Sequence, residues 1–206
     1  MPRDLPAPVY DDAQAVERYV HTIATRMERL VNVSQGRAFL LFSSQRMLNL
    51  VYDRIASRLS YPVLRQGDLP RLLLVQHFRQ RHGSVLFGLK TFWEGVDIAG
   101  EALSLVVIDK VPFEPPDDPV HAARVARMIR NGEDWFGAYV LPQAVLQLKQ
   151  GVGRLLRSQE DRGVMAILDS RLHTRGYGRR VLEALPPAPL TGSLKDVERF
   201  FASPIS

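Results

Sequence analysis

Cysteine is absent from all 206 residues, so this chain forms no disulfide and offers no thiolate ligand to zinc or to an iron–sulfur cluster. That absence fits a reducing compartment without proving one. Long apolar runs are also missing. None approaches the roughly 18–20 residues of a membrane span, and the N-terminus lacks the apolar core of a signal peptide. A cytoplasmic location is therefore the expectation.

A phosphate-binding loop is missing as well, although one stretch imitates it. Gly83 and Gly88 are spaced like the two glycines of a P-loop, but Leu89 stands where the lysine must directly follow the second glycine. The residues between these glycines, 84–87, are largely apolar and predict a strand rather than a turn. No Asp-Glu-Ala-His-like box for magnesium is present. We therefore expect that the chain does not hold a β-phosphate and its metal by itself.

What the chain has in excess is arginine. The net charge is +5, and lysine occurs only at positions 90, 110, 149 and 195. An excess of cations favours a polyanionic partner and salt-sensitive binding. The alternative is a GC-rich genome, which favours arginine codons whatever the ligand.

Apolar runs alternate with helical patterns along the chain. Strands are predicted at 38–42, around 63–64, and at 84–88, 103–109 and 164–169. Helices are predicted from Asp11 or Asp12 to about residue 30, and near 45–59, 70–81, 119–130, 142–157, 175–184 and 193–202. Ser43 and Ser44 are placed to cap the second helix, and Pro119 suits a first helical turn.

Strands that are apolar throughout and alternate with helices indicate a parallel sheet covered on both faces. With right-handed crossovers, this predicts an α/β fold: a RecA-like, doubly wound, mostly parallel sheet. Residues 1–35 are expected to be a lead-in and a helix that packs on the domain, 36–187 the RecA-like domain, and 188–206 a linker and short helix.

The stretch from Gln150 to Arg157 draws attention by its spacing. Arg154 and Arg157 are three residues apart, so on a helix both guanidinium groups can point at one target. Gly151 and Gly153 remove side chains beside that face, which lets a backbone or a phosphate come close. Paired guanidinium groups suit a triphosphate. The alternative is a solvated amphipathic helix with two ordinary arginines.

A second polar stretch follows the predicted strand at 84–88. Thr91-Phe-Trp-Glu-Gly-Val-Asp97 offers a hydroxyl, a glycine and two carboxylates just after an apolar run. In open parallel α/β sheets, ligand sites lie at the carboxyl ends of the strands. This stretch is therefore a candidate ligand loop.

Together these segments resemble a known family. Gln-x-x-Gly-Arg-x-x-Arg at 150–157 is similar to motif VI of superfamily 2 helicases, and 91–97 is similar to their motif V. Val-Pro-Phe-Glu-Pro-Pro-Asp-Asp-Pro at 111–119 resembles the DinG-type helicases, which are bacterial relatives of the xeroderma pigmentosum group D helicase. The resemblance covers roughly residues 36–187. It implies the second motor domain of an ATP-dependent DNA helicase, with a role in DNA repair.

The resemblance implies a nucleotide site. Arg154 and Arg157 would touch the γ-phosphate of ATP, and Gln150 would hydrogen-bond near the nucleotide or the attacking water. Gly95 and Asp97 resemble the pair that meets the nucleotide sugar or couples to motif VI. Two further positions are counted with the nucleotide-binding residues: Glu94 and Gly153. Glu94 has an open alternative as a structural partner of an arginine.

It also implies contacts to single-stranded DNA. Ser43 and Ser44 occupy the position of motif IV, where hydroxyls and helix-start amides meet a phosphate. Gln66 follows another strand, where the family has a similar Gln-Gly pair near DNA. The motif V candidates are Thr91 for a phosphate and Phe92 and Trp93 for base stacking. Core packing is the alternative for one of the two rings. Phe113 and its prolines form either a strand guide or a contact to the first motor domain.

The partners follow from what is missing. ATP with magnesium would be bound mainly by an N-terminal motor domain, supplied in cis or trans, which would also hold any iron–sulfur cluster. We expect a monomer that is inactive as an ATPase on its own. The alternatives are a non-enzymatic RecA-like binding module, and a translocase that remodels protein–DNA complexes or acts on RNA. The motor interpretation requires Arg154, Arg157 and the turn at 94–97 to share one rim.

Overall fold

The computed structural model describes residues 5–8, 12–89, 92, 102–156 and 161–203. Its centre is a sheet of five parallel strands in the order β2-β3-β1-β4-β5. The strands are β1 (Ala38–Phe42), β2 (Val63–Arg65), β3 (Val85–Leu89), β4 (Leu105–Ile108) and β5 (Val164–Ile167). Each lies within a residue or a few of its predicted place. The predicted α/β class with a parallel sheet is confirmed.

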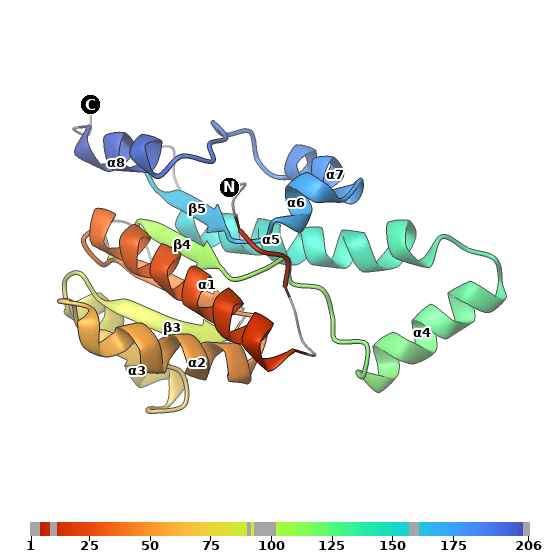
Figure 1. The fold of residues 1–206 in the computed structure, drawn as a ribbon, viewed down its shortest axis with the longest axis horizontal. Coiled ribbons are helices and arrows are strands. Elements are labelled where there is room, and N and C mark those ends of the chain that lie inside the picture. Colours follow the sequence, from red (N-terminus) through yellow and green to blue (C-terminus); the bar gives the residue numbers. More distant parts are fainter. Residues whose placement is uncertain (1–4, 9–11, 90–91, 93–101, 157–160, 204–206) are drawn as a thin grey trace.

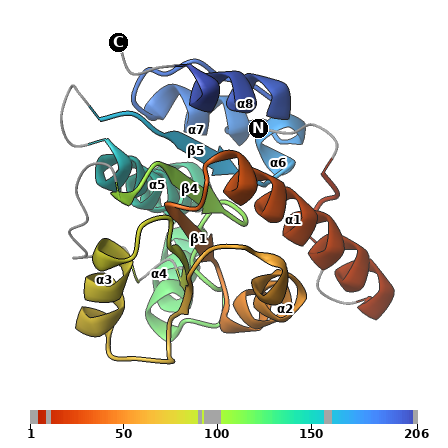
Figure 2. The same cartoon turned by 90° about the vertical axis from the view of Figure 1, so that its left-hand side faces the viewer.

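Helices cover both faces of this sheet (Figures 1 and 2). Side chains of β1 alternate between two cores, with Leu40 and Phe42 on one side and Phe39 and Leu41 on the other. The first core is completed by α1 (Ala13–Val33), α2 (Gln45–Ile55) and α8 (Leu194–Ala202). The second is completed by α3 (Arg71–Gln80), α5 (Leu141–Leu155), α6 (Arg171–Thr174) and α7 (Tyr177–Ala184). The fold is therefore doubly wound.

One helical segment stands away from the sheet. Helix α4 (Pro119–Arg130) and a π-helical turn, η4 (Phe136–Val140), lead into the start of α5, and Figure 1 shows α4 at the far right of the molecule. Arg124 lies over the ring of Tyr139, and His121 stacks on the same ring, so α4 packs mainly on the turn that follows it.

The helix starts follow local sequence rules. The carboxylate of Asp12 accepts from the backbone N–H of Gln14 at 2.9 Å, and the hydroxyl of Ser44 accepts from the N–H of Met47 at 3.3 Å. Asp118 caps α4 ahead of Pro119, accepting from the N–H of His121 at 2.7 Å. Each cap satisfies an amide that the helix itself leaves without a partner. Of the predicted cap residues, Asp11 or Asp12 and the pair Ser43 and Ser44, it is Asp12 and Ser44 that cap their helices, and the first-turn proline is confirmed.

The turn before β1 requires a glycine. Gln35, Gly36 and Arg37 all have positive φ, and a β-carbon on Gly36 would lie 1.8 Å from the carbonyl oxygen of Gly83. The backbones of Gly36 and Gly83 are therefore in contact in the segment that connects α1 to β1. This contact fixes the amino end of β1 beside that of β3.

Two predicted helices differ from the structure in length. The helix predicted at 45–59 ends at Ile55 and continues as a 3-10 turn, η1 (Ala56–Arg58). The helix predicted near 175–184 is α7, and the short α6 comes just before it. A β-carbon on Gly178 would lie 2.0 Å from the carbonyl oxygen of Leu172, so close packing of α6 on α7 sets this corner.

Candidate functional site

Polar residues follow four of the five strands at the same edge of the sheet. Ser43 follows β1, Gln66 follows β2, Asp109 follows β4, and Asp169 comes two residues after β5. Because all strands are parallel, these residues share the carboxyl edge, where open α/β sheets place their ligands. The candidate site is built on this carboxyl edge of the sheet.

Asp109 is the most deeply buried acid of this edge, with no exposed surface. Its carboxylate accepts from the backbone N–H of Ser43 at 3.0 Å, from the hydroxyl of Ser43 at 2.9 Å and from the N–H of Lys110 at 2.8 Å. Burial raises its pKa from 3.8 to about 6, although Lys110 and the hydrogen bonds from Ser43 lower it. Sequence reasoning did not select Asp109, although it ends an apolar strand just as Asp169 does.

The two serines after β1 have different partners. The hydroxyl of Ser43 donates to Asp109, so it is engaged within the domain. Ser44 is exposed, and its oxygen accepts from the N–H of Met47, which leaves its O–H as a donor. Of the predicted pair, Ser44 is thus the one whose hydroxyl is exposed at the start of α2.

Gln66 joins the ends of β2 and β3. Its backbone N–H donates to the carbonyl of Phe87 at 2.8 Å, and its side-chain oxygen accepts from the N–H of Leu89 at 2.7 Å. The side chain is half-buried, and its oxygen is the atom that makes this bond, while its amide nitrogen is a further donor.

Asp169 ties the loop after β4 to helix α6. Its carboxylate accepts from the N–H of Val111 at 2.9 Å and pairs with the guanidinium of Arg171 at 2.7 Å. The same guanidinium lies 5.5 Å from the ring centre of Phe113, whose ring also packs on those of Phe136 and Tyr177. Phe113 is therefore half-buried in an aromatic cluster that fixes the start of the proline-rich loop.

Helix α5 is also fastened to the proline-rich loop. The side-chain amide of Gln147 donates to the carboxylate of Glu114 at 2.7 Å. The other end of that amide, Oε1, is buried and has no hydrogen-bond partner among the residues that the structure describes. Glu114 thus links the segment after β4 to the middle of α5.

Of the motif V candidates, only Phe92 lies within the described residues. Its side chain is 3% exposed and packs on the ring of Phe39, so core packing describes this ring and base stacking does not fit it. The guanidinium of Arg71, at the start of α3, donates to the carbonyl of Phe92 at 2.8 Å and lies over its ring. The other candidates lie outside the described residues: Thr91, Trp93, Glu94, Gly95 and Asp97.

Helix α5 carries the motif VI residues. Its buried face consists of Leu141, Ala144, Leu148, Gly151 and Leu155. Gln150 and Gly153 are exposed, and a β-carbon on Gly153 would meet no atom within 4 Å. The backbone of Arg154 belongs to the last turn of α5, whereas Arg157 lies outside the described residues. The apolar side predicted from Leu148, Leu155 and Leu156 is present at the first two, but Leu156 follows the last residue of the helix and is 38% exposed.

The arginine helix ends at the amino edge of the sheet. A β-carbon on Gly163, the residue before β5, would lie 2.5 Å from the side chain of Leu155 and 2.9 Å from the carbonyl of Ser104, the residue before β4. Leu155 therefore packs where β4 and β5 begin. The turn at 94–97 and Arg157, which the motor interpretation requires on one rim with Arg154, lie outside the described residues.

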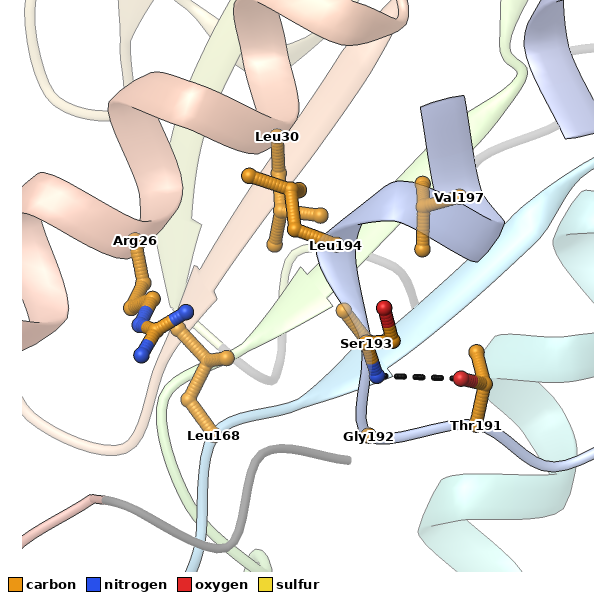
Figure 3. A pocket seen from close by; sticks show the side chains of 9 residues that line it. Arg26, Leu30, Leu168, Thr191, Gly192, Ser193, Leu194 and Val197 are labelled. Carbon is orange, nitrogen blue, oxygen red and sulfur yellow. Dashed lines mark hydrogen bonds between the residues drawn. The ribbon is translucent and has the colours of Figure 1, made fainter. Parts of the chain in front are cut away.

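A pocket lies away from these residues, between α1, the end of β5 and the start of α8 (Figure 3). Leu30, Leu168, Leu194 and Val197 give it an apolar wall, and its volume of about 50 Å³ is too small for a nucleotide. Within the described ranges, no group of three or more histidine, aspartate or glutamate side chains is arranged to hold a metal ion. No described helix is long and apolar enough to cross a membrane.

Comparisons with known proteins agree with this architecture. A model of the helicase C-terminal domain matches residues 27–188. The chain is 42% identical over 184 residues to the ATP-dependent DNA helicase YoaA of Escherichia coli K12. This match covers 89% of the chain and 29% of that protein. It is 41% identical over 183 residues to the ATP-dependent helicase DinG of Mycobacterium tuberculosis H37Rv, and the match covers 89% of this chain and 27% of that protein.

Among solved structures, an XPD helicase superposes on 89% of this chain and 33% of its own, with a TM-score of 0.70 and 19% identity. At that identity the likeness concerns the fold alone. By the coverages of these three matches, the chain spans about a third or less of the length of these proteins.

Proposed function

Because this chain belongs to the helicase C-terminal domain family, we propose that it is the second motor domain of an ATP-dependent DNA helicase of the DinG type. The observation that carries the proposal is helix α5. It bears the Gln-x-x-Gly-Arg pattern in its last two turns, buries its apolar face and exposes Gln150 and Gly153. A helix of this kind presents a polar flank to a partner domain.

In this proposal, Arg154 and Arg157 act across an interface. They reach the γ-phosphate of ATP held mainly by a first motor domain, which supplies the phosphate loop and the magnesium ion. Negative charge develops on the transferring phosphoryl group, and an arginine finger stabilises it, which contributes roughly a thousandfold or more in rate. Gln150 orients the attacking water or the nucleotide. Gly153 leaves open space beside this face, so the nucleotide can approach the helix backbone.

Glu94, Gly95 and Asp97 complete the nucleotide side of the proposal. Gly95 and Asp97 meet the nucleotide sugar or couple the loop to motif VI. Arg71 supports this role indirectly, because it fastens the carbonyl of Phe92 and so fixes where the loop begins.

The carboxyl edge is the proposed path of single-stranded DNA. The O–H of Ser44 and the amides that open α2 receive one phosphate, and the side-chain nitrogen of Gln66 receives another. Thr91 contributes a hydroxyl, and Trp93 is the ring that remains for base stacking, since Phe92 is buried. Ser43 acts behind this surface by holding Asp109. Alternate closing and opening of the interdomain cleft moves the domain along the strand.

The test compares this chain alone with the same chain joined to its first motor domain. We expect no ATP hydrolysis by residues 1–206, with or without single-stranded DNA, and DNA-stimulated hydrolysis by the joined protein. Arg154→Ala and Arg157→Ala are each expected to lower kcat of the joined protein by about a thousandfold. Arg179→Ala is the matched control, because Arg179 is 85% exposed on α7 and pairs only locally with Glu183.

Two results would refute the motor assignment. One is hydrolysis by residues 1–206 on their own. The other is full activity in both arginine variants. A non-enzymatic binding module remains the second candidate, because no phosphate loop or magnesium box occurs anywhere in the sequence. A first motor domain encoded in frame with this chain, or beside it, separates the two.

A further inference from the structure

Helix α8 lies beyond the residues that match the helicase model, which end at 188. It nevertheless packs on the domain: Leu194, Val197 and Phe201 contact the core on the side of α1, and Figures 1 and 2 show α8 beside β5. The helix thus lies outside the residues matched by the family model, yet it contacts the last strand of the sheet and the helix α1.

The start of α8 is anchored by side-chain hydrogen bonds. The hydroxyl oxygen of Thr191 accepts from the backbone N–H of Ser193 at 3.0 Å, as drawn in Figure 3, and the same hydroxyl donates to the carboxylate of Asp196 at 2.5 Å. Leu194 and Val197 then face Leu30 across the small pocket. These contacts seat the first turn of α8 on α1.

The end of α8 is held by a residue from elsewhere in the chain. The guanidinium of Arg162 donates to the carbonyls of Ser203 at 2.9 Å and Phe200 at 2.5 Å, and lies 4.3 Å from the ring centre of Phe200. The last carbonyls of a helix have no partner within the helix and carry partial negative charge. Arg162 therefore satisfies this helix end with both hydrogen bonds and charge.

Arg162 is connected to the last turn of α5 through the residue that follows it. The following residue, Gly163, packs so closely on Leu155 and Ser104 that a β-carbon would lie 2.5 Å from the side chain of Leu155. The N–H of Val164 donates to the carbonyl of Ser104 at 2.9 Å, which fixes this backbone to the start of β4. This packing is a direct structural link between the backbone at Arg162 and the last turn of α5, where Leu155 follows Arg154.

We propose that α8 is a brace for the last turn of α5, and that Arg162 is the positioning residue that connects them. This inference rests on the proposed function of Arg154. A finger arginine acts only within a fraction of an ångström of its productive place, and a misplacement of about 1 Å costs up to about a hundredfold in rate. The brace fixes the helix backbone before the two motor domains close on ATP.

Two measurements test the brace. The first is hydrogen exchange of residues 148–156 in the 206-residue chain, which needs no partner domain. Arg162→Ala is expected to raise this exchange at least fivefold. The second is DNA-stimulated ATP hydrolysis by the protein that contains both motor domains. There the same variant is expected to lower kcat by about tenfold or more, with KM for ATP and affinity for single-stranded DNA within twofold of wild type.

Arg199→Ala is the matched control. It removes the same charge from the end of α8, but its side chain is 80% exposed and pairs only with Asp196. Wild-type exchange and kcat are expected there. Arg162→Lys should recover only part of kcat, because an ammonium group bridges two carbonyls and stacks on a ring less well than a guanidinium does. Phe200→Leu is a milder variant for use if Arg162→Ala fails to fold, and its expected changes are smaller in the same direction.

The outcomes separate the inference from the function on which it rests. Unchanged exchange and unchanged kcat in Arg162→Ala and Phe200→Leu overturn the brace. A lower melting temperature with wild-type kcat per folded molecule also overturns it, because that is a purely structural role. If Arg154→Ala leaves hydrolysis intact, the proposed function fails, while the exchange result still decides whether α8 braces α5.

Discussion

The buried carboxylate of Asp109 makes the stability of this domain depend on pH in an unusual direction. In the folded protein its pKa is raised from 3.8 to about 6 by burial. Well below pH 4 the group is protonated whether the chain is folded or not. Between pH 4 and 6 the unfolded chain ionises first, so this group lowers stability as pH rises, and its full cost is present above pH 6. A shift of about two pKa units corresponds to about 3 kcal/mol.

Three variants isolate this effect in urea unfolding followed by circular dichroism at about pH 4, 5, 6 and 7. Asp109→Asn cannot ionise, so its free energy of unfolding relative to wild type should rise by about 2–3 kcal/mol across that range. Ser43→Ala removes a donor that favours the ionised carboxylate. It should therefore raise the pKa of Asp109 further and cost about 1.5–3 kcal/mol more near pH 7 than near pH 4.

Ser44→Ala is the matched control, because it changes the neighbouring serine, which caps α2 and does not touch Asp109. It should cost about 0.5–2 kcal/mol at every pH, so that its curve runs parallel to that of wild type. Parallel curves for Asp109→Asn and wild type would refute the argument from burial. A pH-dependent effect of Ser44→Ala would refute the division of roles between the two serines.

Two further predictions concern the framework of the site. Gly36→Ala should destabilise the fold by about 3 kcal/mol or more, because its β-carbon would lie 1.8 Å from the carbonyl of Gly83. Gly132→Ala is the control: its φ of +70° is similar but the space around it is open, so it should cost only about 1–2 kcal/mol. Equal losses for the two variants in denaturant unfolding would contradict the close contact at Gly36. Phe92→Ala should cost about 3–5 kcal/mol of stability, because the ring is buried, and should leave the DNA affinity of the folded fraction unchanged. A large loss of DNA affinity without a loss of stability would instead show that Phe92 contacts DNA.

Local signals were sufficient to predict the elements. The caps at Asp12 and Ser44 and the proline at 119 act within one helical turn, and runs such as 38–42 and 105–108 are apolar at every position because both of their faces are covered. The parallel sheet follows from their alternation with helices, and the family follows from short contiguous motifs. None of these inferences depends on a distant contact.

The partners of individual side chains depended on the tertiary structure. Ser43 and Ser44 are adjacent and chemically identical, yet only Ser43 meets Asp109, because the register that pairs Leu41 with Ile108 brings these strand ends together. Phe92 and Trp93 were both candidates for core packing. Only the contact of Phe92 with the ring of Phe39 in the folded protein shows that Phe92 is buried.

Asp109 and Arg162 were not chosen from the sequence. Asp109 is distinguished by its burial, and Arg162 by hydrogen bonds to a helix end 38 to 41 residues further along the chain. The chain's local chemistry thus determined which elements form and in what order. Only the folded backbone, by joining segments far apart in the sequence, decided which polar groups are buried against each other and which are left for a ligand.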